Sequence, residues 1–396
     1  MKENAPPELP VLRFIPFRQE DIVTMCLSEG RLTRTEAEQF SVAGERIEDF
    51  FQRDFAGIKK QLKRAYGPLD PDADTRGLPG SGQADSPSEL AGILETLLYR
   101  ANYEKVTAAE MREALGSSSL FNVQVEVNLD DFDEVLLFTR GATLREETVR
   151  KFFGLRRRPV RFINYERVLL YLRLKADTEA QNAPGMCQPG STMLKLFQNV
   201  PETDLEMLFP NIRVTMRIQD RLLIGIPALI SGGLVVSTKL GTTLLLLASL
   251  IGFWMGWTTE PVELDKTTAL VLLTGAGALV AYLWKQFSKY RNRKLRYTQA
   301  LTEQLYFKLL DNNAGVLYRV LEDAQESESK ECLLAYYCLL AAGRPLAPDE
   351  LDALIEQWFE RKWHCKLDFD VGDALAKLLE LGLARSVDGN WRVAAS

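Results

Sequence analysis

The amino-acid sequence predicts a three-part chain: an α+β soluble N-terminal domain, a transmembrane helical hairpin and a mainly helical, winged-helix-like C-terminal domain. Three patterns carry this prediction. Apolar and polar residues alternate after Gly116, three apolar blocks lie between Leu222 and Trp284, and helical periodicity near the C-terminus is followed by a short hairpin pattern. The corresponding boundaries are residues 1–221, 222–284 and 301–396, with a basic juxtamembrane segment at 285–300.

Composition limits the classes of function. The chain has 396 residues and a net charge of −6, and neither predicted soluble domain carries the basic excess on which nucleic-acid binding relies. We therefore expect no nucleic-acid partner. The five cysteines form no Cys-x-x-Cys pair, and the single histidine, His364, lies beside Cys365. Because a zinc site needs about four converging ligands, the sequence predicts neither a metal nor a cofactor.

The N-terminal part mixes helical and strand patterns. Apolar residues recur at three- and four-residue steps from Ala43 to Tyr66, which indicates an amphipathic helix. Valines at 123, 125 and 127 alternate with polar residues, which indicates a half-buried strand. Further strands are predicted at 135–138, 161–174, 193–197 and 212–216, with a flexible segment at 67–87 and a loop at 176–190.

Two of the apolar blocks, 240–257 and 267–284, contain no charged residue. At about 1.5 Å of rise per residue, each spans about 27 Å as a helix, close to the roughly 30 Å of bilayer hydrocarbon. Pro261 in the short connector prevents one continuous helix and favours a hairpin. The following flank is basic, which places both soluble domains on the cytoplasmic side of a lipid bilayer. The flank also predicts contact with anionic lipid headgroups through Lys285, Lys289, Arg291, Arg293, Lys294 and Arg296.

The placement of the first apolar block, 222–236, is open between three alternatives. The block is short and holds three glycines and a proline, so an interfacial or re-entrant placement is favoured over a full span. In the second block, Gly252 and Gly256 form a Gly-x-x-x-Gly spacing that allows close approach of helices in membranes. This spacing predicts packing either within the hairpin or between copies of a homo-oligomer.

The C-terminal part is predicted to contain a helix that begins at Pro348, a second helix over 369–381 and a hairpin whose turn is Asp388-Gly389. Helices followed by a hairpin resemble a winged-helix domain. Winged helices often bind DNA, but the helix over 369–381 carries three carboxylates against one lysine, a balance that would repel phosphate. We therefore expect protein contact or a structural role here.

Two stretches carry a resemblance to a known family. One reads LKLFQNVPETDLEMLFPNIRVTMRIQDR over 194–221, and the other reads LYFKLLDNNAGVLYR over 305–319 and continues to LLAYY at 333–337. With the apolar hairpin between them, they resemble an uncharacterised family of membrane proteins of bacteria and plants, whose animal relatives are mitochondrial transmembrane proteins. The resemblance implies an architecture but no reaction or ligand. The N-terminus, MKENAPPELP, lacks the features of a transit peptide, which favours a bacterial member.

Five residues in these stretches are candidates for a partner site or a structural motif. Asp204 lies where a helix is predicted to begin, and a carboxylate there accepts early backbone N–H groups. Asp311, Asn312 and Asn313, followed by Gly315, fit a break between helices, because Asp and Asn side chains bond nearby backbone. Structural capping is favoured over a ligand or partner site, and both interpretations stay open.

The leading functional hypothesis is an interaction or scaffold protein of the bacterial inner membrane, with an unknown protein partner and both soluble domains in the cytoplasm. The sequence holds no P-loop, Gly-x-Ser-x-Gly or His-Glu-x-x-His motif, so an enzymatic role is less favoured. Two alternatives remain. One is a membrane-associated enzyme with an unrecognised site in the α+β domain, where the acidic run 130–134 is the strongest feature. The other is an oligomeric two-span channel.

Overall fold

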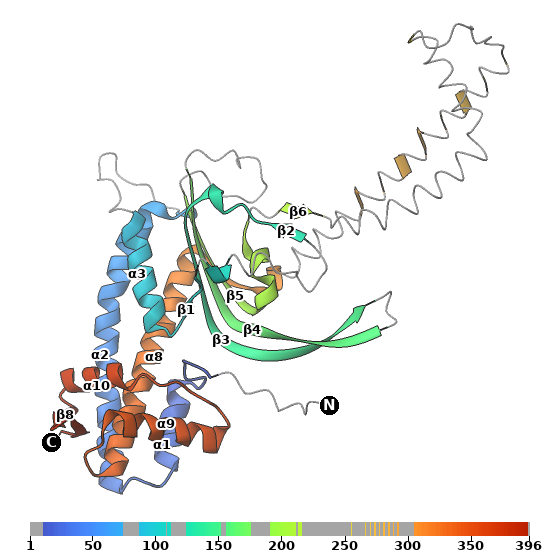
Figure 1. Cartoon of the computed structure of the whole chain (residues 1–396). Helices are drawn as coiled ribbons and strands as arrows, with labels where there is room; N and C mark the ends of the chain where they lie inside the picture. The colour runs from blue at the N-terminus through green and yellow to red at the C-terminus, as the bar shows by residue number, and fades with distance from the viewer. Residues whose placement is uncertain are drawn as a thin grey trace, which may run out of the picture. The chain divides into compact units, whose positions relative to one another are not determined.

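Figure 1 shows the computed structural model of the chain. It describes residues 11–73, 87–107, 109–111, 124–151, 156–175, 191–210, 213–215 and 305–394, with isolated positions between 255 and 292. The contacts define two compact units. The first comprises Met1–Ser117, Val127–Ile212 and Lys308–Ser396, and the second comprises Ser118–Glu126 and Arg213–Phe307. The first unit thus draws on both of the parts that the sequence predicts as separate soluble domains.

The first unit is built around α8 (Asn313–Ala342), a helix that is buried on all sides over much of its length. A helix can be buried all round only when other elements surround it. Figure 1 shows α8 among the helices of this unit, and its contacts involve α1 (Gln19–Ser28), α2 (Arg34–Tyr66), α3 (Pro87–Arg100), α9 (Pro348–Trp363) and α10 (Val371–Glu380). The helical periodicity predicted for residues 43–66 is part of α2, which begins with a capping box formed by Thr33 and Glu36.

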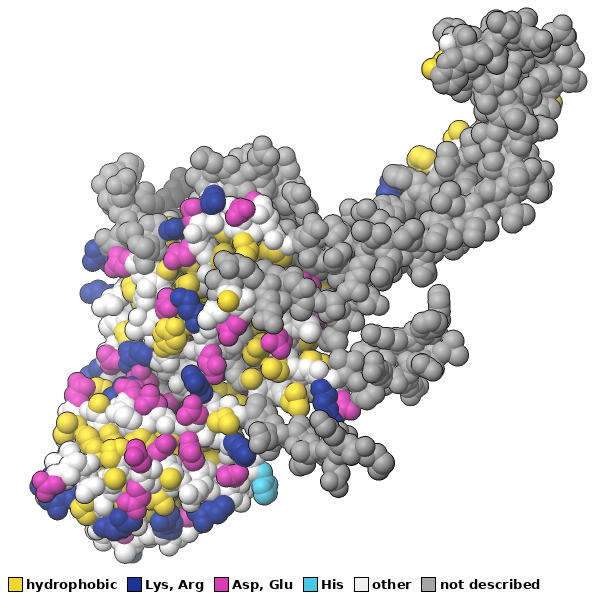
Figure 2. Space-filling model, in the orientation of Figure 1, with side chains coloured by type: hydrophobic (Ala, Val, Ile, Leu, Met, Phe, Trp, Pro, Cys, Tyr) yellow, Lys and Arg dark blue, Asp and Glu magenta, His cyan; other side chains and the backbone are white. Residues whose placement is uncertain are grey.

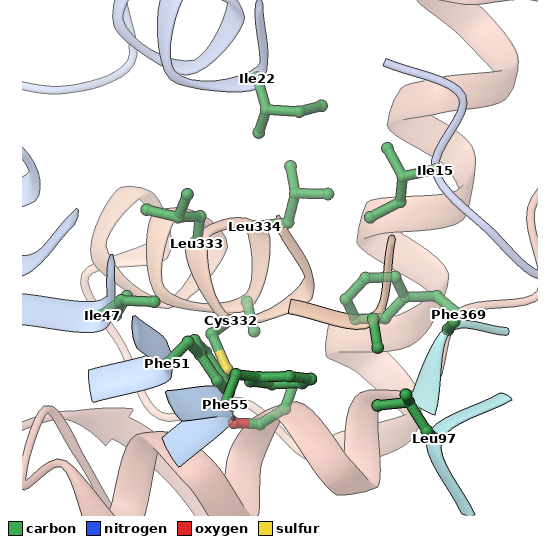
Figure 3. Close-up of a cluster of buried hydrophobic side chains, with 14 of the residues drawn as sticks. Ile15, Ile22, Ile47, Phe51, Phe55, Leu97, Cys332, Leu333, Leu334 and Phe369 are labelled. Atoms are coloured by element: carbon green, nitrogen blue, oxygen red, sulfur yellow. Dashed lines mark hydrogen bonds between the residues drawn. The ribbon is translucent and has the colours of Figure 1, made fainter. Parts of the chain in front are cut away.

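The apolar core of this unit joins residues from both ends of the chain. Figure 3 shows Ile47 and Phe51 of α2 in one cluster with residues of α8, together with Ile15 and Phe369, and each of these four is at most 7% exposed. Complete burial of one such side chain contributes about 1.5–3 kcal/mol. Neither end of the chain can therefore bury its apolar face without the other.

A five-stranded antiparallel sheet lies in the same unit, in the order β1-β3-β4-β5-β7. Its last strand is supplied by the segment that leads into α8, so the sheet and the helices share a junction. The bounds are β1 (Glu104–Lys105), β3 (Phe132–Lys151), β4 (Arg156–Leu174), β5 (Thr192–Pro201) and β7 (Leu309–Asn312). The mixed α and β composition predicted from the sequence is therefore confirmed. The strands predicted at 135–138 and 161–174 prove to be parts of longer ones, because charged residues in β3 and β4 obscure the alternation.

Two strands extend beyond the rest of the sheet (Figure 1). On β3, pairing with β1 stops at Thr139, and on β4, pairing with β5 begins at Asn164. Residues 144–151 and 156–163 therefore form a two-stranded ribbon, which we call the arm. Gly141 has φ of 74° near its base, a conformation that favours glycine.

The C-terminal end shows the predicted order of helices and hairpin. After α9 and α10, β8 (Ala384–Val387) pairs with β9 (Asn390–Val393), and the predicted turn residues Asp388 and Gly389 both have positive φ. Such a pair of positive φ values suits a two-residue hairpin loop. In the second unit, β2 (Gln124–Glu126) pairs antiparallel with β6 (Arg213–Thr215), at the positions where two of the strands were predicted.

The predicted transmembrane hairpin is wrong by the structure: within the described residues, no helix combines the length and the apolar character needed to cross a membrane. A span needs about 20 consecutive apolar residues in one helix, a stricter condition than a run of apolar letters in the sequence. Both α2 and α8 are long enough, but both carry charged residues. The predicted localisation as an integral protein of the inner membrane rested on this hairpin and is therefore wrong as well. Block 222–236 and most of 240–257 and 267–284 lie outside the described residues.

Candidate functional site

A cleft of about 500 Å³ is present in the first unit where three segments meet. These are the N-terminal stretch before α1, the turn from α3 into β1, and the connection between α9 and α10. The described residues that line it are Arg13, Tyr99, Asn102, Tyr103, Glu104, Asp368, Phe369 and Asp370. Ligand pockets occupy roughly 300–1,000 Å³, so this cleft is the candidate functional site.

The turn after α3 holds the cleft against the middle of α8. Asn102 has φ of 57°, a left-handed conformation that asparagine adopts more readily than most residues. Its side-chain amide donates to the Ser327 hydroxyl at 2.9 Å and to a Glu331 carboxylate oxygen at 2.6 Å. Both acceptors lie on α8, so the backbone conformation and the side-chain bonds together fix the position of this turn.

The N-terminal stretch forms one wall of the cleft and is tied down twice. Leu12 exchanges two backbone hydrogen bonds of 2.9 Å with the connection between α9 and α10. The buried Lys330 ammonium on α8 donates to the backbone carbonyls of Ile15 and Phe17 at 3.2 and 3.0 Å. The wall is therefore part of the folded unit.

Two carboxylates of α8, Glu328 and Asp323, are paired with cations. Glu328 is 1% exposed, and its carboxylate accepts from Arg100 at 2.7 Å and lies 3.0 Å from the Lys377 ammonium. Arg140 of β3 lies 3.0 Å from the Asp323 carboxylate. A buried charge is tolerated when it is paired and hydrogen-bonded. These groups support the site and are themselves already neutralised.

The cleft, in contrast, carries an excess of negative charge. Among its described lining residues, three carboxylates stand against the guanidinium of Arg13, whose Nε lies 3.6 Å from Glu104 and 3.3 Å from Asp368. Nearby, burial and the neighbouring carboxylates, Glu356 first among them, raise the pKa of Asp352 to about 6. Figure 2 shows acidic and basic side chains interspersed over the helical part of the unit, so the imbalance in the cleft is local.

Glu331 links the charge of this region to pH. It is 6% exposed, and burial raises the pKa of its carboxyl to about 7, against the hydrogen bond from Asn102, which lowers the pKa. A carboxyl with such a pKa changes its charge near neutral pH. Because Asn102 also lines the cleft, this titration takes place directly behind the candidate site.

The residues that the sequence singled out lie at a different place, the β7–α8 junction (309–315). Asn313 is 8% exposed and has φ of 49°. Its side-chain oxygen accepts from the backbone N–H of Leu194 in β5 at 3.3 Å, and its amide donates to the Asp72 carboxylate. Asn313 therefore joins the start of α8 to the sheet and to the end of the N-terminal helices, and Asn312 makes no side-chain cap bond in this described part of the chain.

Gly315 and Asp311 complete the junction. A Cβ atom added at Gly315 would lie 2.0 Å from Oδ1 of Asp311, a distance that real atoms do not reach. The Asp311 carboxylate also lies 3.9 Å from the guanidinium of Arg319, nearly two turns into α8. The structure thus brings Asp311, Asn313 and Gly315 together at the start of α8, where the Asn313 side chain bonds to residues of distant segments. The choice between capping and a partner site stays a prediction.

Asp204 lies in the 3-10 helix Glu202–Leu208, where the sequence predicted that a helix begins. It is 4% exposed, and its carboxylate lies 3.6 Å from the Lys308 ammonium. Glu206 is 2% exposed, and burial followed by the charge of Asp204 raises the pKa of its carboxyl to about 7. Among the described residues, one Glu206 oxygen finds no hydrogen-bond partner. Sequence reasoning missed Glu206, because its neighbours gave no sign that it is buried.

The remaining predicted residues contribute no described site. Lys285 and Arg291 are exposed helical positions of the second unit. In the acidic run 130–134, Asp133 lies 3.8 Å from Arg173, and no cluster of metal-ligating side chains occurs in the part of the chain that the structure describes. Six predicted packing and headgroup residues lie outside the described residues: Gly252, Gly256, Lys289, Arg293, Lys294 and Arg296.

Comparison with known proteins places one part of the chain in context. Residues 165–315 match a family model described as "Protein of unknown function (DUF3754)". The predicted resemblance to an uncharacterised family is therefore confirmed at the level of a domain of unknown function. No solved structure matches the chain. The matched segment contains the β7–α8 junction but none of the residues that line the cleft.

Proposed function

We propose that this chain is an interaction protein, and that its cleft binds a lysine- or arginine-bearing segment of a partner protein. The observation that carries the proposal is the charge of the cleft, where three carboxylates stand against one guanidinium. Since Arg13 lies within 4 Å of only two of them, the arrangement retains a net attraction for a further cation.

Aromatic side chains favour the same type of ligand. Tyr99 lines the cleft and is 51% exposed, so one part of its ring is available to a ligand. Tyr103 also lines the cleft, and the centroid of its ring already lies 4.7 Å from the Arg140 guanidinium. Ammonium and guanidinium groups are attracted to such ring faces, with about 0.5–1 kcal/mol at exposed sites. Carboxylates and an aromatic ring together favour a long cationic side chain over an anionic or apolar one.

The direct test is fluorescence anisotropy with fluorescein-labelled hexalysine as the probe. We expect the full chain to bind hexalysine, with affinity that falls as salt is raised. The variant Asp368→Asn/Asp370→Asn removes two of the three cleft carboxylates and retains an asparagine cap at the start of α10. Its affinity should fall about tenfold, which corresponds to 1.4 kcal/mol.

A matched control removes the same charge elsewhere. Glu45 and Glu380 are exposed residues of α2 and α10 that do not line the cleft. The variant Glu45→Gln/Glu380→Gln should bind hexalysine within about twofold of the wild type, since remote exposed charges are screened. An equal loss in both variants would show that only the overall charge matters, and the proposal would then be wrong.

An enzymatic role is the second candidate, and the pair formed by Asp204 and Glu206 favours it. Burial gives Glu206 a pKa near neutrality, as a general acid or base requires. A thermal-shift screen against a metabolite library, run with the wild type and with Glu206→Gln, tests this role. A ligand that shifts the wild type alone would support it, and identical profiles would count against it.

A further inference from the structure

We propose that the cationic segment received by the cleft is the arm of a second copy of this chain. The inference rests on the proposed function, because it names the partner of the same cleft. Its consequence is a homo-oligomer in which the arm of one copy enters the cleft of another.

The charge of the arm complements that of the cleft. Residues 145–151 and 156–161 hold seven arginines or lysines against two glutamates, a net charge of +5 in a chain whose total is −6. The basic residues concentrate in the last pairs of the ribbon, at Arg150, Lys151, Arg156, Arg157 and Arg158. Complementary patches of this kind steer association and fix its register.

The arm is also free to accept a partner along its edges. Among the described strands, residues 144–151 and 156–163 form ladder pairs with one another, and neither β1 nor β5 continues beside them. Two-stranded ribbons are of marginal stability by themselves, so a long one gains from a binding partner. Leu144 and Ile163 pair across the ribbon and are 41% and 37% exposed, which adds an apolar contact to the charged ones.

Geometry indicates contact between copies. Glu104 of the cleft pairs with Thr139 of β3, which places the base of the arm beside the site. Lys151 lies twelve residues further along the same strand, about 40 Å away at roughly 3.3 Å per residue. A strand that pairs with β4 over this whole length cannot fold back, so the basic end of the arm can reach only the cleft of another molecule.

The test is sedimentation velocity of the full chain at low salt. The wild type should form dimers or larger species that dissociate as salt is raised. The arm variant, Arg156→Glu/Arg157→Glu/Arg158→Glu, changes the net charge of the arm from +5 to −1. This variant and the cleft variant, Glu104→Lys/Asp368→Lys, should each be monomeric, with association weakened at least about tenfold. The control Arg53→Glu/Lys59→Glu/Lys60→Glu changes three exposed cations of α2 and should associate like the wild type.

Charge reversal makes the test specific. A chain that carries both the arm and the cleft substitutions has a reversed but again complementary pair, and it should associate. Equimolar arm and cleft variants, each monomeric alone, should associate with each other, because the acidic arm of one meets the basic cleft of the other while the native arm meets the native cleft. Failure of the doubly reversed chain to associate, while each single variant folds, would overturn the inference.

The two proposals fail in different ways. A wild type that binds hexalysine yet remains monomeric would leave the proposed function standing and overturn this inference. A wild type that neither binds hexalysine nor forms dimers would overturn both proposals. Binding of an RNA oligonucleotide that requires the arm, with a monomeric wild type, would assign the arm to a different partner and likewise overturn the inference.

Discussion

The β7–α8 junction and the cleft are both rich in polar side chains, but their polar groups are used differently. At the junction, Asn313 bonds to two separate segments, and Asp311 occupies the space that Gly315 leaves open. In the cleft, carboxylates outnumber cations, and the ion pairs of Arg13 are more than half exposed. The first arrangement uses its hydrogen-bonding capacity within the fold, whereas the second leaves charge available for a ligand.

This difference shows why a polar motif in a sequence does not by itself mark a binding site. The junction combines Asp, Asn and Gly within five consecutive residues, and these residue types suit a tight change from strand to helix. The cleft assembles its residues from positions 13, 99–104 and 368–370, which no local pattern connects. The predictions below separate the two regions by stability and by binding.

The largest loss of stability is expected at Asn313. Asn313→Ala leaves the Leu194 N–H without its partner, removes the bond to Asp72 and places alanine at positive φ. We expect the free energy of unfolding to fall by about 3 kcal/mol, since an unsatisfied buried group alone costs roughly 1–3 kcal/mol. Urea denaturation measures this loss. The exposed neighbour Asn312 is the control, and equal losses in Asn312→Ala and Asn313→Ala would contradict our description of the junction.

Gly315→Ala should follow, with a loss of about 2 kcal/mol, because the new methyl group would overlap the Asp311 carboxylate. The additional change Asp311→Gly should restore part of the stability. Gly57, inside α2, is the matched control: no described atom lies within 4 Å of a Cβ added there. Gly57→Ala should therefore stabilise the chain by about 0.5–1 kcal/mol. Thermal unfolding of the three variants distinguishes overlap from helix propensity.

The buried carboxyl of Glu331, behind the cleft, should make the free energy of unfolding depend on pH. Its folded-state pKa of about 7 exceeds the unfolded value near 4.5, so the folded chain binds the extra proton between these values. The stability that protonated Glu331 contributes to the fold is fully present below about pH 4.5 and is lost as the pH rises to about 7. Glu331→Gln mimics the protonated form and should stabilise the chain by about 1 kcal/mol at pH 8 and by little at pH 5. An equal effect at both pH values would contradict the assignment.

The smallest effect on stability is expected at Asp368. Its side chain is 59% exposed in its pair with Arg13, and exposed ion pairs contribute roughly 0–1 kcal/mol. Asp368→Asn should therefore change the free energy of unfolding by less than about 0.5 kcal/mol and still weaken hexalysine binding. A variant that loses stability as Asn313→Ala does would show that Asp368 serves the fold, as the junction residues do.

The sequence predicted local features better than long-range ones. Alternation marked the strands at 124–126 and 213–215, and Asp388-Gly389 marked the final hairpin, because period and turn chemistry are local properties. No local sequence pattern indicated that α8 packs against helices from both ends of the chain. The apolar blocks at 222–284 were read as a membrane hairpin from composition alone, which did not establish a continuous apolar helix.

The candidate site was not predicted from the sequence, for the same reason. The sequence singled out Asp204, Asp311, Asn313 and Gly315 as capping or partner-site candidates, and none of them lines the cleft. The structure buries Asp204 and Asn313 and places Asp311 against Gly315. Asn102 and Glu331 lie more than two hundred residues apart, so their hydrogen bond depends on the tertiary fold. The raised pKa of Glu331 likewise comes from burial, which a single charged letter within a helical pattern does not reveal.

Hydrogen–deuterium exchange with and without unlabelled hexalysine tests the central claim most directly. The arm variant is the suitable protein, because its own arm then does not compete for the cleft. We predict slower exchange at residues 99–105 and 366–370 and unchanged exchange at the β7–α8 junction. Protection at the junction, or at neither region under conditions where hexalysine is bound, would contradict the assignment of the cleft as the binding site.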